Sequence, residues 1–475
     1  MAKRLKNNFF TRSRLLKLLT LLTLPTLLLT GFGCKGLSAT QQAAAKPIAL
    51  EYWTVFDDAD VIRSLVAAYQ AGRPYLNVTV RQLRADELYN RLVEALAEDR
   101  GPDIVAVNNR SLGAFRSKLA PMPPTVKDTI VRVEKTQLGG TNTIINSQMI
   151  NLPTVSELDK EYVQTVKEDV ARNGKIYGLP LSLDTLAIYY NKDLLDRSGI
   201  AEIPKTWEEF QADVKKLTKY DKAGNKILQS GAALGAGNNV PGSDDLLYAL
   251  AKQSKIPFMD RNGRAVFNLL PVNASRGEET PIINVLNFYT DFANATRDTY
   301  SWNETMPSAL DSFVNGTAAF FFGYNYHYTQ IKARAPQLNF DVMPLLQLDP
   351  EAAANAANYS IQTVTAKSKH QNEAWALVNY LTHSGANKEY LTKANRPTAL
   401  RAYIGLQKSD PALAPFVSGL LTADSWYHGK NYEAASRALS DMLREWIQPP
   451  PDPDRALEWK QQILDRAAAK VNQTL

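Results

Sequence analysis

The chain has 475 residues, of which 45% are hydrophobic and 21% are charged, and these values exclude a disordered chain and a multi-span membrane protein. Single hydrophobic cores stop growing at about 250–300 residues, so two lobes or domains are expected. The net charge of +6 does not indicate a nucleic-acid partner, because six of the 54 basic residues lie in residues 1–33, which contain no acid, and the remainder has 48 basic and 48 acidic residues.

The histidines and the cysteine limit the chemistry that this chain can perform. The four histidines are scattered without the spacing of metal ligands, so neither a metal site nor a cofactor is expected. A single cysteine, Cys34, excludes a disulfide within the chain. The sequence also lacks a P-loop and a Gly-x-Ser-x-Gly motif, which favours a binding protein over an enzyme.

The first 46 residues are predicted to be an export signal followed by a tether. Residues 1–33 join a basic start to a leucine-rich stretch, as in a secretory signal, and the apolar part is too short for a bilayer span of about 20 residues. Cys34 stands where bacterial lipoproteins are acylated, although Gly31 replaces the usual aliphatic residue. A plain signal cleavage or an uncleaved anchor is the alternative. Residues 34–46 are predicted to be a flexible tether.

The body of the chain begins with strands and helices in alternation. Period-two and helical spacings of apolar residues predict strands at 48–53, 76–80 and 103–107 and helices at 58–70 and 85–98. This alternation is typical of an α/β fold with a mostly parallel sheet.

The same pattern continues to the end of the chain. Residues 176–190 are apolar and β-rich, and residues 318–323 read as a buried strand. Thr206 and Glu209 form a capping-box pattern at the start of a helix ending at 217. Residues 352–357, rich in alanine, are predicted to be a surface loop. Further helices are predicted at 281–292, 309–314, 373–382, 431–446 and 453–471.

Six segments in a fixed order connect this chain to a known family. They include Gly101-Pro102-Asp103 before a strand and Phe313-Val314-Asn315-Gly316-Thr317-Ala318-Ala319-Phe320 at a helix-to-strand turn. The other four segments are 177–195, 204–210, 374–381 and 395–398. Together they resemble the extracellular solute-binding family that includes maltose-binding protein.

The resemblance implies a two-lobed, periplasmic-binding-protein-like α/β fold of type II with the ligand in a central cleft. Three segments are expected to cross between the lobes, near 180–186, 358–364 and 398–410. The N-terminal lobe is then expected at 47–182 and 364–400, and the C-terminal lobe at 183–363 and 401–475. Residues 121–170 are longer than the family usually has in this region.

Four residues in the first half are candidate ligand contacts. Phe56 and Asp57 follow the first strand, and Asn109 follows the third. The alternative roles are a helix cap for Asp57 or its neighbour Asp58, a core position for Phe56 and a turn cap for Asn109. Asp184 is the one acid in an apolar run, and the resemblance places it where maltose-binding protein has an acidic sugar contact. Its alternative role is a hydrogen bond between the lobes.

Five aromatic residues complete the candidate set, because the apolar faces of sugars stack on aromatic rings. Tyr324 and Tyr326 follow a buried strand, and the resemblance places cleft aromatics there. Trp302, Trp426 and Tyr427 are the others, with core packing as the alternative.

The function expected from these observations is solute capture outside the cytoplasmic membrane. The chain is expected to be the lipid-anchored binding subunit of an ABC importer, monomeric, taking a sugar or oligosaccharide to membrane permease subunits, with no nucleic-acid partner. The same fold also serves polyamines, peptides or glycerol phosphate, and some members report to a sensor. An exported glycoside-processing enzyme with two carboxylates is a more remote alternative.

Overall fold

The computed structural model describes residues 46–135, 141–271 and 278–475. The predicted signal, Cys34 and all but the last residue of the predicted tether lie outside these residues. The described chain divides into two compact units, one with the residues between Thr129 and Asn146 and the other with Ile48–Asp128 and Ser147–Leu475. Both lobes of the fold belong to the second unit.

The first lobe is built on a six-stranded sheet in the order β2-β1-β3-β17-β4, with β9 also paired to β17. The strands are β1 Ile48–Thr54, β2 Leu76–Gln82, β3 Ile104–Asn108, β4 Leu119–Ala120, β9 Leu179–Pro180 and β17 Ser360–Thr365. β1 pairs in parallel with β2 and β3, and β17 runs antiparallel to β3. The parallel βαβ arrangement expected for the start of the chain is therefore confirmed.

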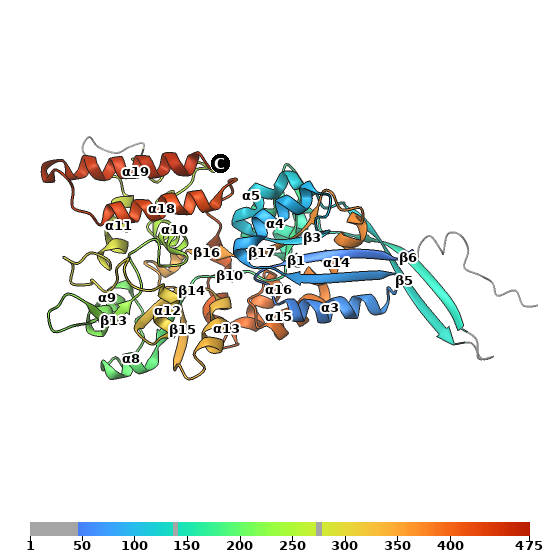
Figure 1. Ribbon diagram of the computed structural model, residues 1–475, viewed down its shortest axis with the longest axis horizontal. Helices are drawn as coiled ribbons and strands as arrows, with labels where there is room; N and C mark the ends of the chain where they lie inside the picture. The colour runs from blue at the N-terminus through green and yellow to red at the C-terminus, as the bar shows by residue number, and fades with distance from the viewer. Residues whose placement is uncertain (1–45, 136–140, 272–277) are drawn as a thin grey trace, which may run out of the picture. The chain divides into compact units, whose positions relative to one another are not determined.

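Helices cover this sheet with their apolar faces. α3 lies alongside β2, and α14 packs on β17 (Figure 1). In α3, Ile62, Leu65 and Tyr69 repeat at helical spacing and are buried. The helices of this lobe are α3 Ala59–Ala71, α4 Ala85–Ala97, α5 Leu112–Phe115, α6 Val155–Glu161, α7 Gln164–Val170, α14 Gln371–Thr382, α15 Ser384–Ala394 and α16 Arg401–Lys408.

The second lobe has a five-stranded sheet in the order β12-β13-β14-β11-β15. All six residues of the central strand β14 are buried, because a strand covered on both faces has no polar side. The strands are β11 Ala187–Asn191, β12 Lys219–Tyr220, β13 Ile227–Ala232, β14 Ala318–Gly323 and β15 Phe340–Pro344.

Long helices close the second lobe. α18 and α19 lie side by side and bury apolar faces in the same core (Figure 1). The helices are α8 Lys192–Arg197, α9 Trp207–Leu217, α10 Ser243–Gln253, α11 Ile282–Asp291, α12 Ala309–Val314, α13 Asn325–Arg334, α17 Ala414–Val417, α18 Tyr432–Trp446 and α19 Ala456–Asn472.

A separate three-stranded sheet contains the segments that cross between the lobes. Its order is β10-β16-β18, with β10 Asp184–Thr185, β16 Asn355–Asn358 and β18 Ala423–Asp424. β10 joins β9 to β11, β16 joins β15 to β17, and β18 precedes α18. Three crossings are present, as the resemblance implied.

The third crossing lies later in the chain than expected. Residues 398–410 do not cross, because α16 buries Ile404 in the core of the first lobe and Leu413 is buried there too. The crossing lies between α17, where Phe416 is buried in a core of the second lobe, and β18. The lobe boundary placed at residue 363 also falls inside β17, which belongs to the first sheet.

One long pair of strands lies in the insertion at 121–170, and one short pair directly follows it. β5 Thr125–Lys135 and β6 Thr141–Asn151 form one two-stranded sheet. β7 Ala171–Arg172 and β8 Lys175–Ile176 form a short antiparallel hairpin. Helices α6 and α7 follow β6 and account for the rest of the insertion.

The alanine-rich segment at 352–357 is not the surface loop that the sequence suggested. From Asn355 onward it forms β16, and its alanines at 356 and 357 are buried. Small side chains allow the three crossing strands to approach closely. Gly419 shows the same constraint, since an added Cβ would lie 2.5 Å from the Asn355 side-chain nitrogen.

The predicted capping box of α9 is half present. The Thr206 side chain accepts a hydrogen bond from the Glu209 amide at 3.1 Å. The Glu209 carboxylate accepts from the Lys205 amide at 2.7 Å, one residue before the position that a capping box requires.

The α9 cap gives a prediction for stability. Thr206→Ala removes the acceptor for one free helix amide, so the free energy of unfolding should fall by about 1 kcal/mol in urea titrations. Thr206→Ser keeps the hydroxyl and is the control, with stability close to that of the wild type. Equal loss in both variants would show that the methyl group rather than the cap matters.

Candidate functional site

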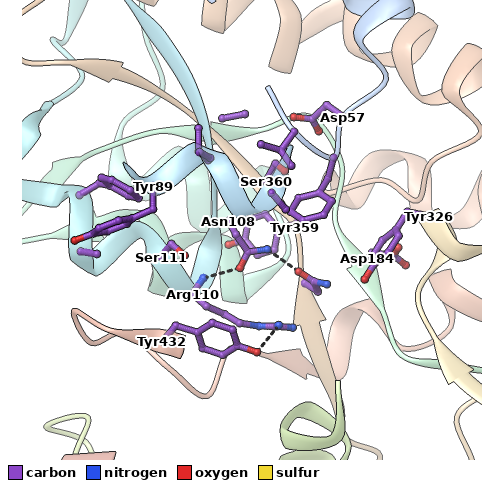
Figure 2. A pocket seen from close by; sticks show the side chains of 18 of the residues that line it. Asp57, Tyr89, Asn108, Arg110, Ser111, Asp184, Tyr326, Tyr359, Ser360 and Tyr432 are labelled. Atoms are coloured by element: carbon purple, nitrogen blue, oxygen red, sulfur yellow. Dashed lines mark hydrogen bonds between the residues drawn. The ribbon is translucent and has the colours of Figure 1, made fainter. Parts of the chain in front are cut away.

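A cavity of about 630 Å³ is lined by residues of both lobes. The first lobe contributes the segments after β1 and β3 and one face of α4, and the second contributes the start of α13 and the segment before α18. In Figure 2, Tyr89 and Tyr326 lie on opposite sides of this pocket, with Asn108, Tyr359 and Ser360 between them. A volume of this size suits a small organic solute, since ligand pockets measure about 300–1,000 Å³.

Buried carboxylates define one side of the cavity. Asp57 is 5% exposed, and its Oδ2 accepts hydrogen bonds from Thr54 and Gln362, each at 3.1 Å. Burial raises the pKa of Asp57, and these two hydrogen bonds oppose the rise. Its neighbour Asp58 is the N-cap of α3. The two adjacent acids therefore have different roles, and the one at 57 faces the cavity.

Asp184 lies at the same side, next to Tyr326 (Figure 2). It is 8% exposed, and burial raises its pKa to about 7, while Arg396 and the backbone amides of Asn325, Thr185 and Tyr326 lower it. The carboxyl group thus titrates near neutral pH and can accept or donate a hydrogen bond to a ligand hydroxyl.

Arg396 is the cation on this side of the cavity. Its Nη2 donates to the Phe56 carbonyl oxygen at 3.2 Å, and its charge lowers the pKa of both Asp57 and Asp184. One cation thus stabilises the charged form of two acids. The net charge on this side of the cavity depends on whether Asp57 and Asp184 are protonated.

Aromatic rings flank the cavity at both sides. The rings of Phe56 and Tyr326 are 5.9 Å apart, and Phe56 is 43% exposed. On the opposite side, the rings of Tyr89 and Phe115 are 5.2 Å apart, and Tyr89 is 50% exposed. Exposed aromatic faces beside buried polar groups form the mixed surface that sugars require.

Amide side chains occupy the middle of the cavity. Asn108 donates to the Asn358 Oδ1 at 2.7 Å, and both residues line the cavity (Figure 2). Asn108 also caps η1 Asn109–Ser111 by accepting from the Arg110 amide at 3.1 Å. Because Asn358 ends β16, the pair joins the end of the third strand to the crossing sheet.

Of the nine predicted ligand contacts, four line the cavity: Phe56, Asp57, Asp184 and Tyr326. Asn109 is buried behind it, where its amide donates to the Ala357 carbonyl and to the Ser425 hydroxyl at 2.7 Å. These bonds hold the loop after β3 against the crossing segments, so the contacts of Asn109 are structural.

The remaining four predicted contacts are buried in the second lobe and do not line the cavity. Trp302 is fully buried, and its indole donates to Asn239 at 3.0 Å. Tyr324 stacks behind Tyr326, with ring centroids 5.9 Å apart. Trp426 donates to Asp245 at 3.1 Å, and the Tyr427 hydroxyl accepts from the Asn431 amide at 2.9 Å. Trp302 belongs to one core of the second lobe, and the other three rings belong to another.

His327 supports the structure and stays neutral. Burial lowers its pKa to about 3, and its Nδ1 accepts from the Tyr324 amide at 3.0 Å. This bond holds the first turn of α13, which positions Tyr326.

Several lining residues were not among the predicted contacts. They are Asn108, Arg110, Tyr89, Phe115, Tyr359, Arg396 and Tyr432. For Asn108 and Arg110 the signal was present, because both flank the predicted Asn109 after a buried strand. Tyr89 is different, since its helical spacing to Leu92 and Leu96 places it on the apolar face of α4, whereas it lines the cavity and is 50% exposed.

In the described part of the chain, no group of three or more His, Cys, Asp and Glu side chains is arranged to hold a metal ion. Nor is any helix there long and apolar enough to cross a bilayer.

Two α/β lobes joined by three crossing strands, with a cavity lined by both, define a cleft-type binding protein. The family model for bacterial extracellular solute-binding proteins matches residues 56–388, and the chain belongs to this family.

Relatives are matched over part of their length. A multiple sugar-binding protein of Streptococcus mutans is 24% identical over 255 residues, which cover 51% of this chain and 56% of that protein. An arabinooligosaccharide-binding protein of Bacillus subtilis is 26% identical over 25% of this chain and 26% of its own length. The chain thus spans little more than half of one relative and about a quarter of the other.

Solved structures share the fold over most of the chain. A cyclic α-maltosyl-1,6-maltose binding protein from Arthrobacter globiformis has a TM-score of 0.66 at 17% identity and covers 90% of this chain and 99% of its own. An ABC substrate-binding protein from Listeria monocytogenes in complex with cycloalternan has a TM-score of 0.64 at 15% identity, with coverage of 90% and 99%. The two-lobed fold inferred from the sequence is confirmed.

The raised pKa of Asp184 predicts how stability depends on pH. The folded state binds this proton more tightly than the unfolded state, whose aspartate titrates at its ordinary value of 3.8. The contribution to the free energy of unfolding is therefore fully present below pH 3.8 and is lost as pH rises to about 7. Asp184→Asn should remove that loss and exceed the wild type by an amount on the order of 3 kcal/mol at pH 8.

Urea unfolding at pH 5 and at pH 8 tests this prediction. The difference between wild type and Asp184→Asn should grow with pH. Asp341→Asn, at an exposed aspartate of β15, is the control and should not share the trend. A constant difference would mean that Asp184 is ionised throughout this range.

Proposed function

We propose that this protein captures a carbohydrate in the interlobe cavity and delivers it to the permease of an ABC importer. The observation that carries the proposal is the cavity side where Phe56 and Tyr326 lie beside Asp57 and Asp184. Sugar rings present apolar C–H faces and hydroxyl groups together. The two aromatic rings can stack on the C–H faces, and the two carboxyl groups can bond the hydroxyls.

The chemistry of the cavity favours a neutral polyhydroxylated ligand. Carboxylate and amide groups form strong hydrogen bonds with hydroxyls, and aromatic faces remove the C–H surface from water. Asp57, Asp184, Asn108 and Asn358 provide oxygens for hydroxyl donors, and the Asn amides provide donors in return. Selectivity then depends on hydroxyl positions and not on ligand charge.

Charged solutes fit this cavity less well. A polyamine would meet Arg396 and Lys430, which both line the cavity. A phosphate ester would meet the two buried aspartates, and the guanidinium of Arg110 is already paired with Asp245.

The names of similar proteins support the same ligand class. The Streptococcus mutans relative is named as a multiple sugar-binding protein, and the two fold neighbours carry or are named for cyclic oligosaccharides. A further fold neighbour from Thermotoga lettingae was solved with α-D-tagatose, a single sugar. We therefore propose that the ligand is a carbohydrate, and the proposal covers single sugars as well as oligosaccharides.

We further propose that the protein acts outside the cytoplasmic membrane as a monomer, anchored by a lipid on Cys34, and does not turn its ligand over. The basic and leucine-rich residues 1–33 support export, and the cysteine directly after them supports acylation. The ABC permease would then take the solute from the cavity.

A thermal-shift screen of the purified full chain tests the ligand class. The probes are maltose, maltotriose, arabinose, tagatose, spermidine, glycerol 3-phosphate and a tripeptide. A probe at 100 times its dissociation constant should add about 2.7 kcal/mol of stability. One or more sugars should raise the melting temperature and be recovered intact. A shift with spermidine or glycerol 3-phosphate alone would overturn the carbohydrate class, and a hydrolysed sugar would overturn the binding role.

Variants locate the binding site within the same screen. Tyr326→Ala removes an aromatic face of the cavity and should abolish the sugar-induced shift. Trp302→Phe is the control, because Trp302 is a large aromatic residue that is buried and does not line the cavity. It should lower the melting temperature of the free protein and keep the shift. The reverse pattern would place the ligand at Trp302.

The lipid anchor has its own test. Cys34→Ser removes the only thiol that a diacylglycerol group could modify. In a bacterial host, the wild type should fractionate with membranes and incorporate labelled palmitate, and the variant should do neither. Label in the variant, or an unlabelled wild type released without a membrane fraction, would contradict the anchor.

A further inference from the structure

An ion pair buried between the lobes lies beside the cavity. Arg110 is in η1, directly after β3 of the first sheet, and Asp245 is in the first turn of α10 in the second lobe. The Arg110 Nη2 donates to the Asp245 Oδ2, and the two side chains are 8% and 1% exposed. The pair therefore joins groups from the two lobes out of contact with bulk water.

The second lobe surrounds Asp245 with further donors. The Tyr324 hydroxyl donates to its Oδ2, and the Trp426 indole donates to its Oδ1 at 3.1 Å. Burial raises the pKa of Asp245, and the Arg110 charge opposes the rise. Both donors come from the same lobe as Asp245, while the guanidinium comes from the other lobe.

Arg110 has additional partners on the second lobe. Its Nη1 donates to the Tyr432 hydroxyl at 2.9 Å, and its guanidinium lies over the Tyr432 ring, 5.1 Å from the centroid (Figure 2). The Tyr432 hydroxyl donates in turn to the Asp244 Oδ2 at 2.7 Å. A planar guanidinium with ordered donors fits such a site better than an ammonium group does.

The backbones of the two lobes also meet a few residues further on. A Cβ added at Gly113 of α5 would lie 2.1 Å from the Gly429 carbonyl oxygen and 2.5 Å from that of His428. Glycine is thus required for α5 to approach the loop before α18. The segment around Arg110 therefore contacts the second lobe through both side-chain and backbone atoms.

We propose that Arg110 is a closure latch, whose bonds to Asp245 and Tyr432 form when the lobes meet and hold the cavity closed before a ligand arrives. The proposal rests on the proposed capture of a solute in the interlobe cavity, and it extends that function to the empty protein. Opening the cleft would separate the guanidinium from its partners and leave Asp245 without a cation among buried rings.

The latch has a consequence for affinity. When only the closed form holds a ligand fully, the apparent dissociation constant equals the intrinsic constant divided by the closed fraction. Arg110 raises that fraction. Loss of the latch therefore weakens binding through the conformational equilibrium.

Distances between spin labels on the two lobes test the latch without any ligand. The full chain carries Cys34→Ser with labels at Asp60→Cys in α3 and Glu202→Cys in the second lobe, whose native side chains are 92% and 79% exposed. The latch-intact protein should show one short distance. Arg110→Met and Asp245→Asn should each add a longer population, and the double variant should add no more than either single one.

Gly113→Ala should open the cleft by another route, because its methyl group would clash with the Gly429 carbonyl oxygen although Arg110 and Asp245 are unchanged. It should also add the longer population. Gly405→Ala is the matched control, since a Cβ at this glycine of α16 meets nothing within 4 Å. Circular dichroism verifies that each variant is folded.

The outcomes separate this proposal from the proposed function. An unchanged short distance in folded Arg110→Met and Asp245→Asn would overturn the latch and make the pair a fixed strut, whatever the sugar screen shows. Additive effects of the two substitutions would also overturn it. If the longer population forms and no sugar binds in the thermal-shift screen, the latch stands and the carbohydrate class fails.

Discussion

The pairing of three short strands in one sheet is the constraint on which the rest of this structure depends. Every crossing between the lobes in the described residues passes through β10, β16 or β18. The Asn355 side chain joins β16 to the residue that follows β10, accepting from the Leu186 amide at 3.1 Å and donating to its carbonyl at 2.9 Å. Because Asp184 begins β10 and Asn358 ends β16, cavity groups are attached directly to the segments about which the lobes can turn.

Local patterns predicted the elements well where one physical signal dominated. The helix predicted at α3 and the strand predicted at β14 are both present, because the apolar residues of each element are buried in a core. The alanine-rich segment at 352–357 failed for a different reason. Its composition carries no periodicity, and only the need for close approach at the crossing sheet explains its small side chains.

The candidate site could be predicted in part, and the limits follow from tertiary packing. Asp184 was predicted because an acid within an apolar run must face something polar, and it lines the cavity. Trp302 and Trp426 do not line it, because an aromatic ring gives the same sequence signal in a core as in a cavity. Arg396 is distant in sequence from the acids it serves, so no local pattern connects them.

The interleaving of the lobes also determines when the first core can form. β17 belongs to the first sheet, although it follows all of the second-lobe strands β11–β15 in the sequence. Its Thr363 hydroxyl donates to the Val105 carbonyl oxygen, 258 residues earlier in the chain. A nascent chain therefore has the edge of β3 unpaired until the second lobe has been synthesised. Such long-range pairing slows folding.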